Sequence, residues 1–392
     1  TAVENRKLLP LPRLEVLDDI PAEGLAITGA RLEISPRPLR LLQINALSLW
    51  AFQRVTRRYR VRCLARGVYT FGPLTVRSGD PFGLLTRERR QEQNERLLVY
   101  PLVVPLARFG LPARAPFGER PAPRRLLEDP LRLGGVRPYE RGDEPRRIHW
   151  KATARTAQLQ SKVYEPSAHH TLAIFVDQRT FDSATVGYDP ALVELAICVA
   201  ASVANWGIDA GYDVGAYANG LAVTSMEHDE DAPGVGAEAA VSARPLSLRL
   251  RIPPGTDRAQ LPRIQEGLAR LIPFFPAPIS QILAEEEKRL PLGTTLVYIG
   301  TPTALGQAGL ARLRRLRARG HGVALLLVGD APLDVDDLPI TRVGNASTWE
   351  RLLADALARR GVAPPATNRQ APAEPPAPDG APPLALELEG IR

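Results

Sequence analysis

The sequence predicts an α+β two-domain chain, in which a β-sandwich-like domain precedes a doubly wound α/β domain. In residues 1–104, short alternating apolar runs are separated by Gly and Pro turns, which is typical of small antiparallel sandwiches. In residues 166–361, continuous apolar runs alternate with helical patterns, which is typical of a parallel sheet covered by helices. With 392 residues and 44% apolar content, the chain can form more than one core.

The N-terminal strands are expected where polar and apolar residues alternate. In Arg58–Leu64 this alternation places Tyr59, Val61 and Cys63 on one face of a strand. The chain begins with Thr1 and runs at once into a strand-like phrase. We therefore expect the first domain to be truncated at its N-terminus and the chain to be a fragment of a longer protein.

Two segments lack any periodic pattern. Residues 105–136 are rich in Pro, Arg and Gly and are predicted to form an extended linker. Residues 362–392 are dominated by proline and alanine at their start and are predicted to be a disordered tail. From Pro105 to Arg155, twelve basic residues face six acidic ones, so this stretch carries +6 of the net charge of +7.

The α/β domain is predicted from buried strands and capped helices. Asp189-Pro190 is a typical helix start, Ser347-Thr-Trp-Glu350 is a capping box, and Asn219-Gly220 is predicted to be the turn of a hairpin over 213–224. The predicted strands are 171–176, 294–299 and 323–328, and the predicted helices are 190–206, 261–271, 278–289, 310–319 and 347–360. No run of about 18 apolar residues occurs, so no membrane-spanning helix is expected within the chain.

Asp177 directly follows the first α/β strand, at the edge where doubly wound sheets bind ligands. The order of elements resembles a von Willebrand factor A-like domain. In that family, this position begins an Asp-x-Ser-x-Ser site whose oxygens hold Mg²⁺. Here Arg179 and Phe181 replace the two serines and Thr180 is out of register, so we favour a degenerate site in which Arg179 pairs with Asp177. Binding of Mg²⁺ is the alternative.

Other catalytic patterns do not emerge from the sequence. Cys63 and Cys198 lie in apolar contexts and are expected to be free thiols. Adjacent His169 and His170 would point to opposite faces of a strand, which makes them poor ligands for one metal. The loop Gly300-Thr-Pro-Thr303 offers hydroxyls without a carboxylate. Because no phosphate loop, nucleophile elbow or HExxH motif occurs, no catalytic residue and no cofactor are predicted.

The densest cluster of aromatic and basic residues lies between Arg137 and Arg155. Gly142-Asp143 is predicted to form a tight turn, with Arg146 placed to pair with Asp143 or with an acidic group on the other domain. Ile148 and Trp150 are two residues apart and would be buried on one side of an extended segment. Ala152, Ala154 and Arg155 suit a short helical turn. We favour a structural clamp between the two domains over a recognition surface for a partner or an anionic ligand.

This cluster resembles a known bacterial family. The phrases Tyr139-x-x-Gly142-Asp143, Arg146-x-Ile148-x-Trp150 and Ala154-Arg155 are similar to the signature of the family numbered fifty-eight among the domains of unknown function. We therefore name residues 137–165 the signature segment. The upstream phrases Arg66-Gly-Val-Tyr69, Asp80-Pro-Phe-Gly-Leu84 and Val99-Tyr-Pro101 resemble the preceding β-region of that family.

The resemblance implies an N-terminal membrane hairpin, here upstream of Thr1, followed by a β-domain and a von Willebrand factor A-like domain. It places the parent protein at the cytoplasmic face of the bacterial inner membrane, while this fragment is expected to be soluble. It also implies genetic association with MoxR-type AAA+ ATPases and no established activity. We therefore expect a non-enzymatic interaction module, an adaptor for such an ATPase in envelope or complex assembly.

Two other functions are weighed against this adaptor. The first is binding of nucleic acid or anionic lipid through the arginine cluster in 105–155, although few aromatic residues lie among the arginines and nucleic acid is not the favoured partner. The second is a metal-dependent hydrolase, which would need a functional cation site at Asp177.

Overall fold

The computed structural model describes residues 1–37, 39–80, 85–92, 95–112, 116–117, 128–140, 142–166, 170–181, 187–222, 249–273, 277–333 and 335–360. The predicted disordered tail and His169 lie outside these residues. Residues 1–351 form one compact unit and residues 352–392 a second. The β-rich part and the α/β sheet therefore belong to one unit, whereas the sequence predicted two separate domains.

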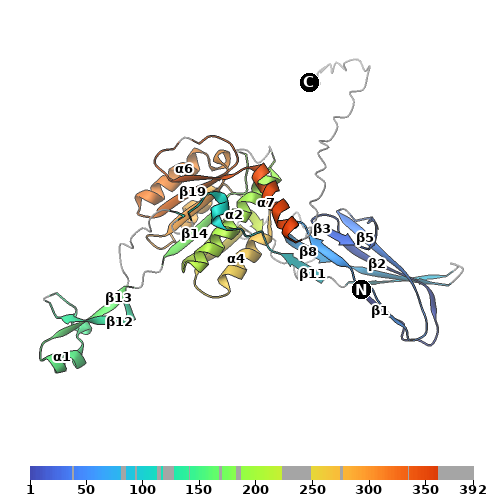
Figure 1. The fold of residues 1–392 in the computed structure, drawn as a ribbon, viewed down its shortest axis with the longest axis horizontal. Coiled ribbons are helices and arrows are strands. Elements are labelled where there is room, and N and C mark those ends of the chain that lie inside the picture. The colour runs from blue at the N-terminus through green and yellow to red at the C-terminus, as the bar shows by residue number, and fades with distance from the viewer. Residues whose placement is uncertain are drawn as a thin grey trace, which may run out of the picture. The chain divides into compact units, whose positions relative to one another are not determined.

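The N-terminal part is β-rich, as predicted (Figure 1). Its main sheet is antiparallel with the order β10-β9-β2-β5-β4, and β1–β6, β3–β7 and β8–β11 form separate pairs. A small core forms around Leu14, Val16 and Leu49. The strands are β1 (Ala2–Glu4), β2 (Leu11–Pro21), β3 (Leu25–Thr28), β4 (Arg31–Ile34), β5 (Arg40–Leu49), β6 (Arg54–Thr56), β7 (Arg60–Cys63), β8 (Gly67–Phe71), β9 (Leu74–Gly79), β10 (Thr86–Gln91) and β11 (Glu95–Val99).

The predicted linker is wrong where the structure describes it. Leu106–Phe109 form a 3-10 turn, η1, and the side chains of Leu106, Phe109 and Leu111 are buried. Glu128–Pro138 form β12, which pairs antiparallel with β13 (Gln160–Pro166). Proline and arginine content suggested a solvated segment, but the leucines and Phe109 supply enough apolar surface to pack. Residues 113–115 and 118–127 lie outside the described part.

The second sheet has the order β16-β15-β14-β18-β19-β20, with the short β17 also pairing β15. Strands β15, β14, β18, β19 and β20 are parallel, and β16 and β17 are antiparallel to β15. The strand order reverses at β14, which is followed in the chain by β15 on one side and later by β18 on the other. The strands are β14 (Thr171–Val176), β15 (Asp213–Ala222), β16 (Arg249–Gly255), β17 (Leu271–Ile272), β18 (Thr295–Gly300), β19 (Gly322–Val328) and β20 (Ile340–Gly344).

Helices cover both faces of this sheet (Figure 1). On one face, Gly207 of α2 packs directly on Leu172 and Val214. On the other face, Phe175 packs in one cluster with Ile282 and residues of α6. The alternation of Leu172 and Phe175 explains why β14 is apolar throughout. The helices are α2 (Pro190–Asp209), α4 (Gln260–Ala269), α5 (Ile279–Glu286), α6 (Pro302–Ala318) and α7 (Ala346–Arg359).

Most helix predictions are confirmed, with shifted ends; the largest shift is at α6, which begins at Pro302 and not at 310 as predicted. The Asp189 side chain accepts hydrogen bonds from the N–H groups of Ala191 and Leu192, as expected of an N-cap. At α7 the prediction placed the cap at Ser347, but Asn345 Oδ1 accepts the Thr348 N–H (3.3 Å). In the described chain, α2 alone is long and apolar enough to cross a membrane, yet it packs against the sheet as a core helix and 67% of its most apolar window is buried.

The predicted hairpin over 213–224 is wrong. β15 runs without interruption from Asp213 to Ala222 and pairs in parallel with β14, so Asn219 and Gly220 lie inside a strand. Asn219 is fully buried, and its side chain is hydrogen-bonded to Asp177 and to the Gln178 N–H at the C-terminal end of the parallel strands. A Cβ atom at Gly220 would overlap the Gln178 side chain, so glycine is needed there for close packing and not for a turn.

The β-rich part is joined to the α/β part by Arg66. Its guanidinium, only 7% exposed, pairs with both carboxylate oxygens of Glu194 in α2 (3.0 and 3.1 Å). Its Nη1 donates to the carbonyl oxygens of Leu268, Ala269 and Leu271, at 2.7–3.2 Å. Leu268 and Ala269 lie at the C-terminus of α4, where cations are stabilised, and Leu271 begins β17 directly after it. One arginine thus fixes two helices against the β-rich part.

Candidate functional site

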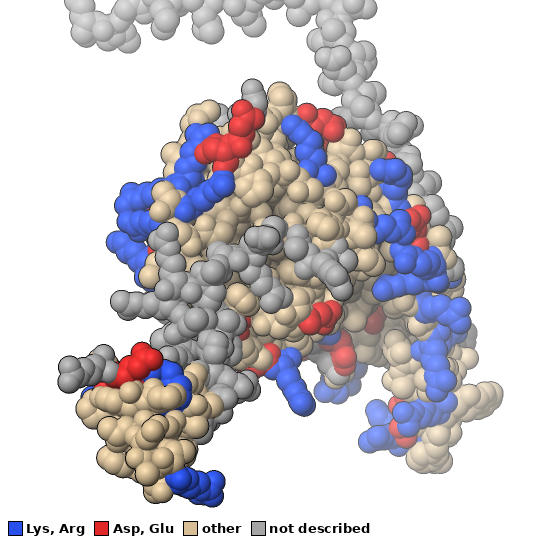
Figure 2. All heavy atoms as spheres, turned by 60° about the vertical axis from the view of Figure 1, so that its left-hand side comes forward, with Lys and Arg blue, Asp and Glu red and all other residues tan. Residues whose placement is uncertain are grey.

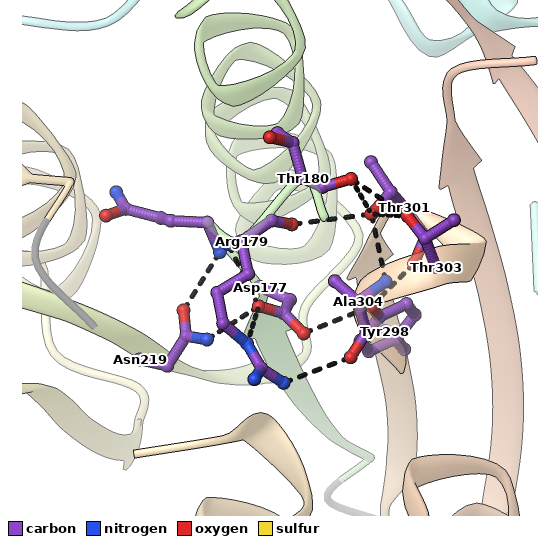
Figure 3. Close-up of polar contacts among 9 residues, drawn as sticks. Asp177, Arg179, Thr180, Asn219, Tyr298, Thr301, Thr303 and Ala304 are labelled. Atoms are coloured by element: carbon purple, nitrogen blue, oxygen red, sulfur yellow. Dashed lines mark hydrogen bonds and ion pairs between the residues drawn. The ribbon is translucent and has the colours of Figure 1, made fainter. Parts of the chain in front are cut away.

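Polar side chains from three neighbouring strands lie together at the C-terminal ends of the parallel strands, which we call the sheet edge (Figure 3). Asp177 follows β14, Asn219 lies near the end of β15, and Thr301 follows β18. This edge lies beside the strand where the order reverses, which is the usual ligand position in open α/β sheets. The position of Asp177 was predicted from the sequence, whereas Asn219 was assigned to a turn and missed.

Asp177 is buried and bonded on both oxygens. Its Oδ1 accepts the Asn219 side-chain amide (2.6 Å) and the Arg179 N–H (3.1 Å). Its Oδ2 accepts the Tyr298 hydroxyl in a longer contact of 3.4 Å. The Asn219 carbonyl in turn accepts the Gln178 N–H (2.9 Å). The carboxylate is therefore held by donors from the two strands on either side of β14.

Arg179 lies against this carboxylate, as the sequence suggested. Its Nε is 3.7 Å from Asp177 Oδ1, and its Nη2 donates to the Ala304 carbonyl at the start of α6 (3.0 Å). The guanidinium is largely buried and spans from β14 to the loop after β18 (Figure 3). The positive charge beside Asp177 is thus supplied by the chain itself.

The two remaining residues of the predicted loop have different surroundings. The Thr180 hydroxyl accepts the Asp189 N–H (2.8 Å), and its carbonyl accepts the hydroxyls of Thr301 (3.1 Å) and Thr303 (2.8 Å). Thr180 therefore fastens the loop to the starts of α2 and α6. Phe181 is partly exposed at the surface.

Burial dominates the electrostatics of this edge. Burial raises the pKa of Asp177 above its usual value of 3.8, although the Arg179 charge and the Asn219 hydrogen bond act in the opposite direction. Burial and the neighbouring carboxylate raise the pKa of Tyr298 well above 10, so the phenol stays a donor. The edge is therefore filled by the chain's own polar side chains, most of which are hydrogen-bonded to one another. Among the described residues, the buried Arg179 Nε and both polar atoms of the Gln178 side chain have no hydrogen-bond partner.

These residues do not fit a Mg²⁺ site. A hard divalent cation needs several free oxygen ligands, but the oxygens of Asp177 accept N–H and O–H donors, and a guanidinium lies 3.7 Å from Oδ1. In the part of the chain that the structure describes, no group of three or more His, Cys, Asp or Glu side chains could hold a metal ion. Binding of Mg²⁺ by another arrangement stays an untested alternative.

The signature segment forms a hairpin of its own. The signature hairpin consists of β12, the turn η2 (Pro145–Arg147), α1 (Trp150–Thr156) and β13. Asp143 closes its inner turn: its Oδ1 pairs with Arg137 Nη2 (2.6 Å) and its Oδ2 accepts the Glu140 N–H (3.1 Å). The Tyr139 hydroxyl donates to the Asp143 carbonyl (2.8 Å), and Gly142 adopts a φ of 117°. The predicted Gly142-Asp143 turn is confirmed.

Other predictions for this segment are wrong. Asp143 pairs with Arg137, while Arg146 is exposed in η2. Ile148 is half-buried and bridges to Ser161, whereas Trp150 is 68% exposed. The two do not share a buried side because the chain leaves the extended conformation at His149, which caps α1 through Nδ1. Ala154 and Arg155 lie in α1, as predicted.

The ion pair that the structure shows between the β-rich part and the α/β part is Arg66–Glu194, not one made by Asp143 or Arg146. Arg66 belongs to an upstream phrase that the sequence singled out only for its family resemblance. A single arginine followed by Gly67 gave no signal of burial. Its role depends on α2 and α4, which lie more than a hundred residues further along the chain.

Comparison with known proteins gives a family model that matches part of the chain and one similar protein. A family model described as "Protein of unknown function DUF58" matches residues 135–228, which include most of the signature hairpin, the Asp177 loop, α2 and β15. The chain is also similar to "Uncharacterized protein YeaD" from Bacillus subtilis (strain 168), with 26% identity over 186 residues. This alignment covers 46% of the chain and 44% of the relative, so the chain spans less than half of that protein.

Proposed function

We propose that the chain is a non-enzymatic interaction module of a membrane-anchored bacterial protein, and an adaptor for a MoxR-type AAA+ ATPase. The observation that carries the proposal is the contrast between a closed sheet edge and an exposed signature hairpin. At the edge, Asp177 and Arg179 neutralise each other. On the hairpin, Trp150 offers a large apolar side chain to a partner.

The strand order supports a von Willebrand factor A-like identity for the α/β part. Five parallel strands with an antiparallel edge strand, and an aspartate directly after the first strand, are what the sequence resemblance leads one to expect. In this interpretation Arg179 takes the place of a ligand hydroxyl and supplies the positive charge that a metal would bring. A reaction that needs an open cation at this edge is therefore disfavoured, including metal-dependent hydrolysis.

The surface of the signature hairpin supports protein recognition. Its described residues from 135 to 163 include six basic and three acidic side chains, with Lys and Arg at the margins of a largely uncharged surface (Figure 2, lower left). An exposed tryptophan surrounded by cations is a typical centre of a protein interface. The expected partner surface is apolar at its centre and acidic at its rim.

Binding of nucleic acid or anionic lipid through the arginines of 105–155 remains the alternative for this segment. Phosphate contacts would make such binding fall steeply with salt. A partner that binds around Trp150 would instead depend chiefly on apolar contact and respond weakly to salt.

The test is a pull-down and titration of the chain with the MoxR-type ATPases of its own genome. We expect Trp150→Ala to weaken the complex at least tenfold, since a central tryptophan contributes about 2 kcal/mol or more. Trp50→Ala, which removes a similarly exposed tryptophan from the β-rich part, is the matched control and should bind like the parent. Absence of a complex with any such ATPase, or equal binding by Trp150→Ala, would contradict the proposal.

A further inference from the structure

Two adjoining loops of the β-rich part expose four large apolar side chains. Leu8 and Leu9 lie between β1 and β2, and Trp50 and Phe52 lie between β5 and β6. Their exposed fractions range from 67% to 78%. Single exposed apolar residues are common, but four on neighbouring loops form a patch that needs an explanation. We name these four residues the apolar loop pair.

A buried asparagine holds the two loops together. The Asn5 side-chain amide donates to the carbonyl oxygens of Leu9 (2.9 Å) and Trp50 (3.0 Å). The Asn5 backbone N–H donates to the Gln53 carbonyl (2.9 Å). Asn5 itself is only 2% exposed. The loops therefore present their apolar side chains from a fixed backbone.

Several polar backbone groups of these loops are hydrogen-bonded within the loop pair. Lys7 N–H donates to Asn5 Oδ1 (3.1 Å), and Trp50 N–H donates to Gln53 Oε1 (2.8 Å). Gln53 N–H donates back to the Trp50 carbonyl (3.2 Å). An apolar solvent cannot supply such partners, so a segment that enters lipid must satisfy its own backbone. This arrangement meets that requirement at several of the loop groups.

Cations lie in and next to the apolar loop pair. Residues 1–10 and 50–58 contain one acidic side chain, Glu4, and five exposed basic ones: Arg6, Lys7, Arg54, Arg57 and Arg58. Arg6, Lys7 and Arg54 belong to the loop end of the β1–β6 pair, whereas Arg57 and Arg58 lie at its other end, beside Thr1. Arg6 pairs with Glu4 at 3.5 Å. Segments that bind at the interface of an anionic bilayer typically combine basic residues with Trp, Phe and Leu.

We infer that the apolar loop pair docks onto the surface of an anionic lipid bilayer. Leu8, Leu9, Trp50 and Phe52 enter the boundary between headgroups and acyl chains, and Arg6, Lys7 and Arg54 lie among the lipid phosphates. A lipid occupant is favoured over a protein because the exposed side chains of the loops are mainly apolar or cationic and several backbone groups are hydrogen-bonded within the loops. This inference does not depend on the adaptor role, which involves the signature hairpin.

The test is co-sedimentation of the 392-residue chain with vesicles of phosphatidylcholine and phosphatidylglycerol, beside vesicles of phosphatidylcholine alone. We expect the chain to bind the anionic vesicles, and Trp50→Ser/Phe52→Ser to weaken this binding at least tenfold. Arg6→Glu/Lys7→Glu should weaken binding to the anionic vesicles while leaving the weak association with neutral ones unchanged. The side chains changed in the two double variants, Trp50, Phe52, Arg6 and Lys7, are all exposed, so the thermal unfolding of both variants should match that of the parent.

The matched control is Trp150→Ser, which removes an equally exposed tryptophan from the signature hairpin and should bind vesicles like the parent. The inference is overturned if the parent fails to sediment with anionic vesicles or if Trp50→Ser/Phe52→Ser binds as well as the parent. It is also overturned if Trp150→Ser loses as much binding, because the membrane contact would then lie on the hairpin.

Discussion

The sheet edge and the signature hairpin each contain an aspartate, an arginine and a tyrosine, but they use them differently. At the edge, Asp177, Arg179 and Tyr298 are brought together from β14 and β18, more than a hundred residues apart. In the hairpin, Arg137, Tyr139 and Asp143 lie within seven residues. In the first set Asp177 and Tyr298 are fully buried and Arg179 is largely buried, whereas all three residues of the second set are half-buried.

Because the two sets differ in burial, they contribute differently to the stability of the protein. A buried set loses free energy when any member is removed, because its partners cannot turn to water. A half-buried local set keeps contact with water and can fix the shape of its own turn without supporting the core. The most conspicuous motif in the sequence therefore shapes a surface, while scattered single residues hold the fold.

The largest effect is expected for Asp177→Ala. The change leaves the buried Asn219 amide without its acceptor and removes the counter-charge of Arg179. The Tyr298 hydroxyl loses its 3.4 Å contact with Asp177 and keeps the Thr301 carbonyl at 3.2 Å. Removing one member of a buried pair costs about 3–5 kcal/mol, so the free energy of unfolding in urea should fall by that amount. Asp177→Asn keeps an acceptor of the same shape and should lose clearly less. Equal losses in the two variants would show that the negative charge, which both variants remove, matters more than the size and the acceptor, which only Asp177→Ala removes.

The dependence of stability on pH should have opposite signs at the two aspartates. Burial raises the pKa of Asp177 in the folded state, so its contribution is complete below pH 3.8 and is lost as pH rises through the folded pKa. The Glu140 N–H and then Arg137 lower the pKa of Asp143, so its contribution is present above pH 3.8 and is lost as pH falls through the folded pKa.

Urea unfolding at a series of pH values can separate these two contributions. In the parent, ionisation of Asp177 should lower the free energy of unfolding as pH rises above 3.8, and this decrease should be absent in Asp177→Asn. Protonation of Asp143 should lower it by a smaller amount as pH falls below 3.8, and this decrease should be absent in Asp143→Asn. Matching pH profiles for Asp177→Asn and the parent would mean that the carboxyl titrates alike in the folded and unfolded chain.

Local patterns in the sequence predicted most elements of the α/β part. The apolar runs at 171–176, 294–299 and 323–328 correspond to β14, β18 and β19, and Asp189-Pro190 starts α2 as expected. These signals work because strands buried on both faces and helix caps are fixed by neighbouring residues. The predicted pairing of Arg179 with Asp177 is also present, since both belong to one loop.

Two predictions failed where the residue type was compatible with two structures. Asn219-Gly220 is a strong turn signal, yet it lies inside β15 because Asn219 bonds Asp177 and Gly220 makes room for Gln178. Trp150 looked like a buried residue of an extended segment, yet α1 begins there. In both cases the side-chain type was compatible with two structures, and contacts with distant strands or a local cap decided between them.

The smallest effect is expected for Arg146→Ala, and it tests the clamp that the sequence suggested. Arg146 is exposed, so the free energy of unfolding should change by less than about 0.5 kcal/mol. Arg66→Ala is the matched arginine: it leaves Glu194 and the carbonyls of Leu268, Ala269 and Leu271 without their donor and should cost roughly 3 kcal/mol. Thermal and urea unfolding of both variants provide the measurement. A large decrease in the free energy of unfolding for Arg146→Ala, with no decrease for Arg66→Ala, would contradict this prediction. It would show that Arg146 belongs to a buried interface and that the signature segment clamps the two parts together.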